Sequence, residues 1–167
     1  MTARLALEGL EVRAGGRVLL GPINLDLRAG ECLGLVGESG SGKSLSVLSL
    51  LGLLPPGLEA TGTLHLDGRA ITLESRQHHA LRGRTIAWMP QDPQASLHPL
   101  RTVGAQLCES LRVLRRLDAR SARREAIALF ERLQLPEPAA LLARHPHQLS
   151  GGQRQRVMLA RALAGAP

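Results

Sequence analysis

Residues 37–44 read Gly-Glu-Ser-Gly-Ser-Gly-Lys-Ser, a spacing of residue types that suits the binding of phosphate groups. Phosphate oxygens require many hydrogen-bond donors in a small space, and glycines let the backbone approach them closely. Lys43 adds a mobile positive charge for the terminal phosphates, and Ser44 adds a hydroxyl that can ligate Mg2+. The pattern G-x-x-x-x-G-K-[ST] therefore predicts a phosphate-binding loop, made of Gly37, Glu38, Ser39, Gly40, Ser41, Gly42, Lys43 and Ser44.

Such a loop is expected between a strand and a helix, and the flanking sequence predicts both. Residues 31–36 form a short apolar run that predicts a strand of a parallel sheet, and residues 43–54 predict a helix that ends before a Pro-Pro-Gly stop. The helix N-terminus would favour an anion at the loop. Lys43 is also the only lysine among the 21 lysine and arginine residues, at a position where a compact ammonium differs most from a guanidinium.

Gln91 is a second candidate, because it follows another apolar run, residues 84–89, which also predicts a central strand. Pro90 and Pro93 favour an extended loop around it. Ligands of open α/β sheets bind at the carboxyl ends of the strands, so the Gln91 carbonyl could ligate Mg2+ or orient water. Considered alone, an ordinary polar loop is an equally good interpretation.

A third candidate precedes the helix predicted from residue 154 to about residue 163. Ser150 can cap this helix, and Gly151 and Gly152 open its N-terminus to an anion. Ser-Gly-Gly is common in loops, so a simple capped helix start explains this stretch if it is considered alone.

The composition fits a single domain of 167 residues with a core of Leu, Val, Ile and Ala, since 44% of the residues are hydrophobic and 1% aromatic. The net charge is +7, with arginines concentrated between residues 112 and 132. We favour a solvated helical face over a nucleic-acid site, because no aromatic residues are interleaved for base stacking.

The cysteines and histidines suggest no metal or disulfide framework. Cys32 and Cys108 lack C-x-x-C spacing, and we expect Cys32 to be a small buried residue of its strand. The six histidines form no metal constellation that the spacing supports. The N-terminus lacks the apolar region of a signal peptide, and no run is long enough to span a bilayer, so a link to a membrane is expected to pass through a partner.

The remaining chain predicts an α/β core with a helical insertion. Alternating apolar residues predict N-terminal strands at residues 5–12, 17–20, 23–27 and 63–66. From Thr102 the apolar period becomes helical, with Ser121 as the predicted cap of a second helix. Residues 94–148 are therefore interpreted as the helical insertion.

The stretches 37–45, 91–99 and 145–153, in this order, resemble the nucleotide-binding subunit of ATP-binding cassette (ABC) transporters, particularly the oligopeptide, dipeptide and nickel importer branch. The resemblance covers essentially the whole chain. It implies a P-loop NTPase (ABC ATPase) core with an N-terminal antiparallel β part. The implied organisation is one partial ABC ATPase domain over 1–167: an α/β core (1–93), a helical insertion (94–148), and a signature motif with its helix (149–167).

The resemblance also implies roles, with ATP and Mg2+ as cofactors. Residues 37–44 would bind the ATP phosphates, and Ser44 and Gln91 would contact Mg2+. A second ATPase subunit, either identical to this chain or different from it, would face this one. The γ-phosphate of its ATP would be contacted by Ser150, Gly151, Gly152 and Gln153. Other implied partners are integral-membrane permease subunits and, indirectly, a substrate-binding protein, with no nucleic acid. Uptake of a small peptide or of nickel would be driven from the cytoplasmic face of a bacterial membrane.

The sequence departs from this family at three places. No aromatic residue near Ala14 can stack on adenine, and His98 stands where the branch usually has Asn. The chain also ends at Pro167, before the strand that carries the family's Asp-Glu pair, so no catalytic residue is identified. We therefore expect this chain alone to bind ATP poorly, not to turn it over, and to leave the 32–36 strand with an unpaired edge.

Other functions remain compatible with parts of the sequence. A non-hydrolysing ATP-binding regulatory module, or a truncated remnant, would account for the absent Asp-Glu pair. A P-loop kinase or GTPase would share residues 37–44 but not the Leu-Ser-Gly-Gly-Gln stretch at 149–153. A soluble ABC protein acting on translation or DNA repair would account for the arginines, but such proteins usually carry paired cassettes or coiled-coil insertions.

Overall fold

The chain forms two compact units, Met1–Leu81 and Arg82–Pro167, in a computed structural model that describes residues 5–90, 92 and 96–167. Each unit has its own buried apolar residues, such as Leu7 and Leu64 in the first and Leu107 and Phe130 in the second. The finer division at residues 93 and 148 stays a prediction. In the described part of the chain, no helix has the length and apolar character needed to cross a bilayer.

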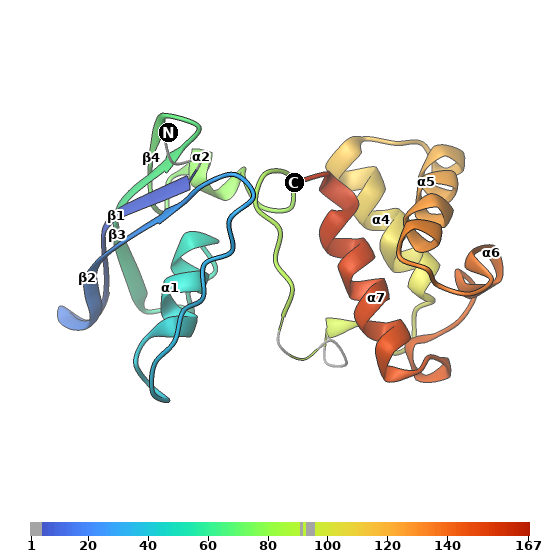
Figure 1. The fold of residues 1–167 in the computed structure, drawn as a ribbon, viewed down its shortest axis with the longest axis horizontal. Helices are drawn as coiled ribbons and strands as arrows, with labels where there is room; N and C mark the ends of the chain where they lie inside the picture. The colour runs from blue at the N-terminus through green and yellow to red at the C-terminus, as the bar shows by residue number, and fades with distance from the viewer. Residues whose placement is uncertain (1–4, 91, 93–95) are drawn as a thin grey trace. The chain divides into compact units, whose positions relative to one another are not determined.

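The first unit is built on a four-stranded antiparallel sheet with strand order β2-β1-β3-β4 (Figure 1). Its strands are β1 (Leu5–Ala14), β2 (Arg17–Leu27), β3 (Leu58–Leu66) and β4 (Arg69–Thr72). The predicted antiparallel β part is thus confirmed. The two separate strands predicted at residues 17–20 and 23–27 are in fact one, because β2 continues through Gly21-Pro22. As an edge strand, β2 tolerates a proline that cannot donate to a ladder.

Helix α1 (Lys43–Leu50) follows the glycine-rich loop and is shorter than predicted. Gly52 adopts a left-handed conformation with φ of 60°, and its N–H donates to the Ser49 carbonyl. The N–H of Leu53 reaches back to the Leu48 carbonyl at 2.8 Å, which completes a glycine-based helix stop. The helix therefore ends at Leu50, and the turn at Gly52, not the prolines that follow, stops it. A second short helix, α2 (Arg76–His79), follows β4.

The two predicted central strands are wrong: neither residues 31–36 nor residues 84–89 form a strand. Among the described residues, Ile86 forms an isolated bridge with Arg82, just before the second run. Val36 is 94% exposed, and Cys32, expected to be buried, is exposed as well. Parallel strands persist when neighbours pair with them and both faces are covered. Among the described residues, no parallel strand pairs with either run.

The second unit is helical and packs around one apolar core (Figure 1). Its elements are α4 (Val103–Arg115), α5 (Ala119–Arg132), α6 (Pro138–Leu141), η1 (Pro146–Gln148), α7 (Gly151–Ala162) and η2 (Leu163–Gly165). The predicted cap of α5 is wrong, because Asp118 is the N-cap and accepts from the Ser121 backbone N–H at 2.9 Å. The Asp118 carboxylate lies three residues before this N–H, the spacing of an N-cap acceptor. Asp118 therefore caps α5 in place of Ser121.

Candidate functional site

The predicted phosphate-binding loop forms a concave backbone turn in the first unit. Gly40 and Gly42 have φ of 83° and 92°, left-handed conformations that strain a residue with a side chain. The Ser41 N–H donates to the Glu38 carbonyl at 3.2 Å and closes the turn. The loop borders a cavity of about 320 Å3, lined by Ser39, Gly40, Ser41, Gly42, Lys43, Ser44 and Leu45.

Lys43 folds its side chain back over this loop. Its ammonium donates to the carbonyl oxygens of Gly37 at 2.7 Å and Glu38 at 2.6 Å, and to the Ser41 hydroxyl at 3.3 Å. The positive charge is therefore held beside the cavity by the loop itself. An incoming phosphate would find a cation already oriented at its binding surface.

The N-terminus of α1 is available to an anion. Gly42 is the N-cap and provides no side-chain hydrogen bond, and the first turn contains no acidic residue. Neither the N-cap nor a side chain of the first turn therefore compensates the partial positive charge of the helix. Ser44 is exposed in this turn, and its hydroxyl has no hydrogen-bond partner within the described ranges. A serine hydroxyl in this state can ligate a Mg2+ ion that accompanies a phosphate.

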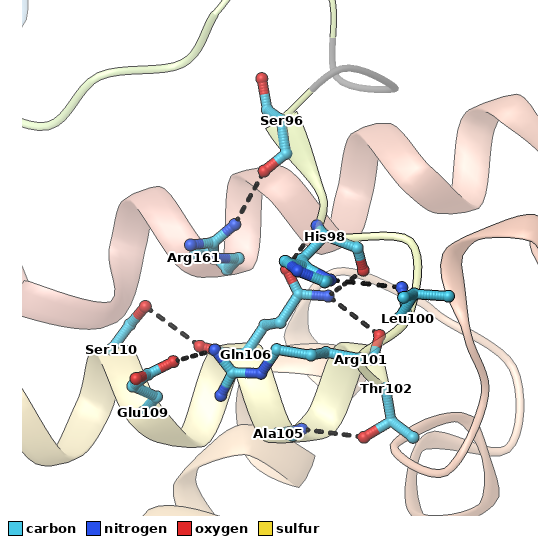
Figure 2. Close-up of polar contacts among 10 residues, drawn as sticks. All are labelled: Ser96, His98, Leu100, Arg101, Thr102, Ala105, Gln106, Glu109, Ser110 and Arg161. Atoms are coloured by element: carbon cyan, nitrogen blue, oxygen red, sulfur yellow. Dashed lines mark hydrogen bonds and ion pairs between the residues drawn. The ribbon is translucent and has the colours of Figure 1, made fainter.

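The candidate Gln91 lies outside the described residues. In the segment that follows it, His98 and Arg101 are held by Gln106, a residue that is 4% exposed (Figure 2). The Gln106 amide accepts from the His98 N–H at 3.0 Å and donates to the carbonyls of His98 at 3.1 Å and Arg101 at 3.0 Å. Gln106 was not among the residues predicted from the sequence. Its position on the buried face of α4, between Val103 and Leu107, was the available signal.

His98 takes a role that an asparagine can fill in turns. Its Nδ1 accepts a hydrogen bond from the N–H of Leu100, two residues later, at 3.2 Å. An asparagine side chain commonly forms the same contact to a following backbone N–H. The histidine at this position is therefore compatible with the local turn.

The candidate residues Ser150 to Gln153 start helix α7 in the second unit. The Ser150 hydroxyl accepts from the Gln153 N–H at 3.3 Å, and the Gln153 side chain accepts from the Ser150 N–H at 2.9 Å. This reciprocal cap confirms Ser150 as the predicted cap, but α7 begins at Gly151, three residues before the predicted start at residue 154. Gly151 and Gly152 are exposed, neither has a positive φ, and a Cβ at either position would meet no atom within 4 Å.

The candidates thus form two groups in different units, the loop 37–44 in the first and residues 150–153 in the second. Within each group the side chains lie together as the sequence predicts. Each group also begins an α-helix whose first turn lacks an acidic residue. Both helix starts can accept negative charge from a ligand.

The ligand atoms of Glu74, His78 and His79 lie within 4.8 Å of one another, although the sequence suggested no histidine constellation. Both ring nitrogens of the buried His78 are already engaged. Nδ1 accepts from the Glu74 N–H at 3.1 Å, and Nε2 lies 2.9 Å from the Leu50 carbonyl. A metal could bind His78 only by displacing one of these bonds. The arrangement therefore serves to connect the β4–α2 turn to the end of α1.

The sequence matches the family model described as ABC transporter over residues 20–167. A probable peptide ABC transporter ATP-binding protein from Sinorhizobium fredii is 41% identical over 151 residues, which cover 89% of this chain and 45% of the relative. The oligopeptide transport ATP-binding protein OppD of Salmonella typhimurium is 41% identical over 146 residues, 87% of this chain and 44% of that protein. A glutathione import ATP-binding protein of Pectobacterium atrosepticum is 42% identical over 149 residues, with coverages of 83% and 23%.

Solved structures agree with the sequence comparison. The dimeric bacterial ABC transporter cassette MJ0796 has a TM-score of 0.76 and 29% identity, covering 98% of this chain and 70% of that chain. The cbiO1 protein of Clostridium perfringens, part of the cbiONQ transporter complex, has a TM-score of 0.74 and 25% identity, with coverages of 99% and 62%. The chain spans less than half the length of the three curated relatives named above.

Proposed function

The chain belongs to the ABC transporter family of ATP-binding proteins, and from this membership we propose that it binds ATP at residues 37–44 and serves the import of small peptides. The observation that carries the proposal is the loop itself. Lys43 holds its ammonium against the Glu38 carbonyl at 2.6 Å, beside a cavity of about 320 Å3 at the start of α1. A cation, glycine backbone and an uncapped helix N-terminus together suit a polyphosphate.

Mg2+ is proposed to accompany the nucleotide. The Ser44 hydroxyl, exposed and without a partner within the described ranges, offers an oxygen ligand next to the cavity. The Gln91 side chain is proposed as a second oxygen ligand from its position in the motif. A bound Mg2+ neutralises charge on the phosphate oxygens during phosphoryl transfer. Ser44 and the loop bind and orient the nucleotide, while Lys43 supplies the charge that faces its terminal phosphates.

We propose that Ser150 to Gln153 contact ATP that is bound to a second ATPase subunit. Glycine is a poor helix former, yet Gly151 and Gly152 occupy the first turn of α7. Neither crowding nor backbone conformation requires glycine there, since a Cβ would meet open space and φ is not positive. Close approach of an external group explains both residues. The proposed group is the γ-phosphate of ATP on the facing subunit, with Ser150 and Gln153 shaping the turn.

We propose that this chain binds permease subunits at the cytoplasmic face of a bacterial membrane and that ATP drives transport through them. A substrate-binding protein would take part indirectly. Among the relatives named above, one is named for oligopeptide transport, one for probable peptide transport and one for glutathione import. These names favour a small peptide as the cargo. Nickel, the other cargo of the branch that the sequence resembles, is an alternative outcome of the same test.

The test is a complementation experiment in a bacterium that lacks its own peptide-importer ATPase. The polypeptide is expressed as its own gene encodes it, together with its permease subunits, and uptake of a radiolabelled tripeptide and of nickel is measured. We expect ATP-dependent tripeptide uptake that Lys43→Ala abolishes. Uptake of nickel without uptake of the tripeptide would identify nickel, not a peptide, as the cargo. ATP binding without turnover or uptake would instead support a non-hydrolysing regulatory module.

A further inference from the structure

Glu74, His78 and His79 form a cluster of possible metal ligands at the turn between β4 and α2. One ligand atom of each residue lies within 4.8 Å of the ligand atoms of the other two. The cluster lies in the first unit and is remote in sequence from the loop 37–44. Spacing alone did not indicate it, because the Glu74 carboxylate reaches His79 through a turn in which Glu74 has a φ of 60°.

The hydrogen bonds of His78 decide which of its ring nitrogens carries the proton. The Leu50 carbonyl can only accept, so the Nε2 atom of His78, 2.9 Å away, is the donor. The Nδ1 atom accepts from the Glu74 N–H at 3.1 Å and therefore holds the lone pair. Histidine binds metals as a neutral ring with a lone pair on one nitrogen, while the other nitrogen donates to a group such as a backbone carbonyl. His78 is held in this form.

A metal at the Nδ1 atom of His78 would displace only the bond from the Glu74 N–H. That bond is the longer of the two that the ring makes, and Glu74 lies at the surface, where water can satisfy its N–H instead. The bond from Nε2 to the Leu50 carbonyl would remain and would orient the ring toward the metal. The connection between the β4–α2 turn and the end of α1 is therefore compatible with a metal site.

Glu74 and His79 already lie at the separation that two ligands of one ion require. The Oε2 atom of Glu74 is 3.2 Å from the Nε2 atom of His79. Two ligands that are each about 2.0–2.1 Å from a tetrahedral ion lie about 3.3 Å apart. The side chains of Glu74 and His79 are 39% and 43% exposed, so an ion can reach them and they can rotate toward His78. The fold thus supplies one fixed ligand on a buried ring and two adjustable ligands at the surface.

We propose that Glu74 Oε2, His78 Nδ1 and His79 Nε2 bind a divalent transition-metal ion of the zinc class, with water as the remaining ligand. Two imidazoles and one carboxylate suit Zn2+, Co2+ and Ni2+, whereas Mg2+ prefers oxygen ligands. The carboxylate also offsets one of the two charges of the ion. The site differs in chemistry from the Mg2+ site proposed at Ser44 and does not depend on ATP. A bound ion would fasten the β4–α2 turn to α1 through His78 and the Leu50 carbonyl.

The experiment measures Zn2+ binding by isothermal titration calorimetry, with Mg2+ in excess, on the polypeptide as its own gene encodes it and without a histidine tag. His79→Ala and Glu74→Gln each alter an exposed ligand and leave the buried His78 in place. His147→Ala is the matched control, because His147 is also exposed and its ring lies 5.6 Å from that of His145. Groups that merely hydrogen-bond to a metal ligand contribute about ten- to a hundredfold to affinity. We therefore expect the Kd for Zn2+ to rise by about tenfold or more in the first two variants and to stay unchanged in the control.

Nitrogen-15 NMR of the histidine rings identifies the binding atoms independently of affinity. Zn2+ should shift the resonances of His78 Nδ1 and His79 Nε2, and His78 Nε2 should keep its proton because it still donates to Leu50. Loss of that proton on Zn2+ binding would overturn the proposed ligand set. An unchanged Kd in His79→Ala or Glu74→Gln, an equal rise in His147→Ala, or no Zn2+ binding by the wild type would overturn the site. Equal Tm values for the wild type and the variants in the absence of Zn2+ would show that the substitutions leave the fold intact.

Discussion

The Nζ atom of Lys43 lies 2.6 Å from the carbonyl oxygen of Glu38, five residues earlier in the same loop. Together with the 2.7 Å contact to the Gly37 carbonyl, this bond directs the lysine charge toward the loop backbone. Lys43 therefore has two tasks. It stabilises the curvature of the loop, and it presents a cation to whatever enters the adjoining cavity.

Removal of this charge should weaken nucleotide binding. A charge-assisted hydrogen bond contributes about 1.5–3 kcal/mol, so Lys43→Ala should raise the Kd for ATP by roughly ten- to a hundredfold. Isothermal titration calorimetry with Mg2+ present, on the polypeptide as its own gene encodes it, measures the change. Thermal unfolding of both proteins is the control, since a large drop in Tm would indicate that the loop had lost its fold. Equal Kd values in two well-folded proteins would contradict the assignment of the site.

Two glycines in the second unit should respond in opposite ways to alanine. A Cβ on Gly104 would lie 2.5 Å from the Leu142 carbonyl oxygen and 2.9 Å from its Cα, where backbone must move to make room. Gly104→Ala should lower the free energy of unfolding by about 1–3 kcal/mol, as overpacking does. The Cβ added by Gly151→Ala would meet no neighbouring atom, so this substitution should leave the free energy of unfolding unchanged or slightly higher. Urea unfolding followed by circular dichroism compares the two, and equal destabilisation would show that Gly151 is required by the fold.

The parts of the site that depend on local spacing could be predicted from the sequence. The loop 37–44, the start of α1 at Lys43 and the cap at Ser150 each follow from residues within a few positions of one another. Local hydrogen bonds and glycine conformations decide these structures, and short patterns record them directly.

The parts that depend on distant pairing could not be predicted in the same way. The apolar runs 31–36 and 84–89 have strand character, but a strand also needs a neighbour, and the described residues supply none. Gln106 is a different case, because it satisfies two backbone positions, His98 and Arg101, that lie outside its helix. Nothing in an amphipathic pattern specifies which loop a buried amide will hold.

The exposure of residues 31–36 predicts the relative reactivity of the two cysteines. Cys32 is exposed, whereas burial raises the pKa of the Cys108 thiol despite the opposing effects of Arg123 and Arg112. Because the thiolate is the nucleophile, iodoacetamide near pH 8 should alkylate Cys32 several times faster than Cys108. Peptide mass spectrometry after short exposure measures both rates. Protection of Cys32 would instead support the buried strand that the sequence alone predicted.

The cap of α5 should make a small contribution to stability that depends on pH. Hydrogen bonds from the Ser121 backbone N–H and hydroxyl lower the pKa of Asp118 below its ordinary value of 3.8. A depressed folded-state pKa stabilises the protein above the unfolded value, and this contribution is lost as the pH falls through the folded value. Asp118→Asn keeps a capping side chain without the charge. The difference in Tm between the wild type and Asp118→Asn should shrink as the pH falls from about 5 to about 2. A Tm difference that stays constant over this range would contradict the contribution of the Asp118 charge.

The final prediction concerns the exposed start of α7 and separates folding from association. Gly151→Asp places a carboxylate at a helix N-terminus, where the helix dipole favours negative charge, so the Tm should stay equal or rise. The same carboxylate would face the γ-phosphate of ATP on a second subunit and repel it. ATP-dependent dimerisation, measured by light scattering with Mg2+ on the polypeptide as its own gene encodes it, should therefore be lost. ATP binding to the monomer should remain, because residues 37–44 lie in the other unit.

Val113→Asp provides the matched control for that experiment. Val113 is 65% exposed on α4, so its replacement adds the same charge to the same unit at a position with no proposed phosphate contact. We expect this variant to dimerise with ATP as the wild type does. Loss of dimers in both variants would point to a general effect of net charge. Normal dimers in Gly151→Asp would exclude close approach of a facing γ-phosphate to Gly151, and the two exposed glycines would then need another explanation.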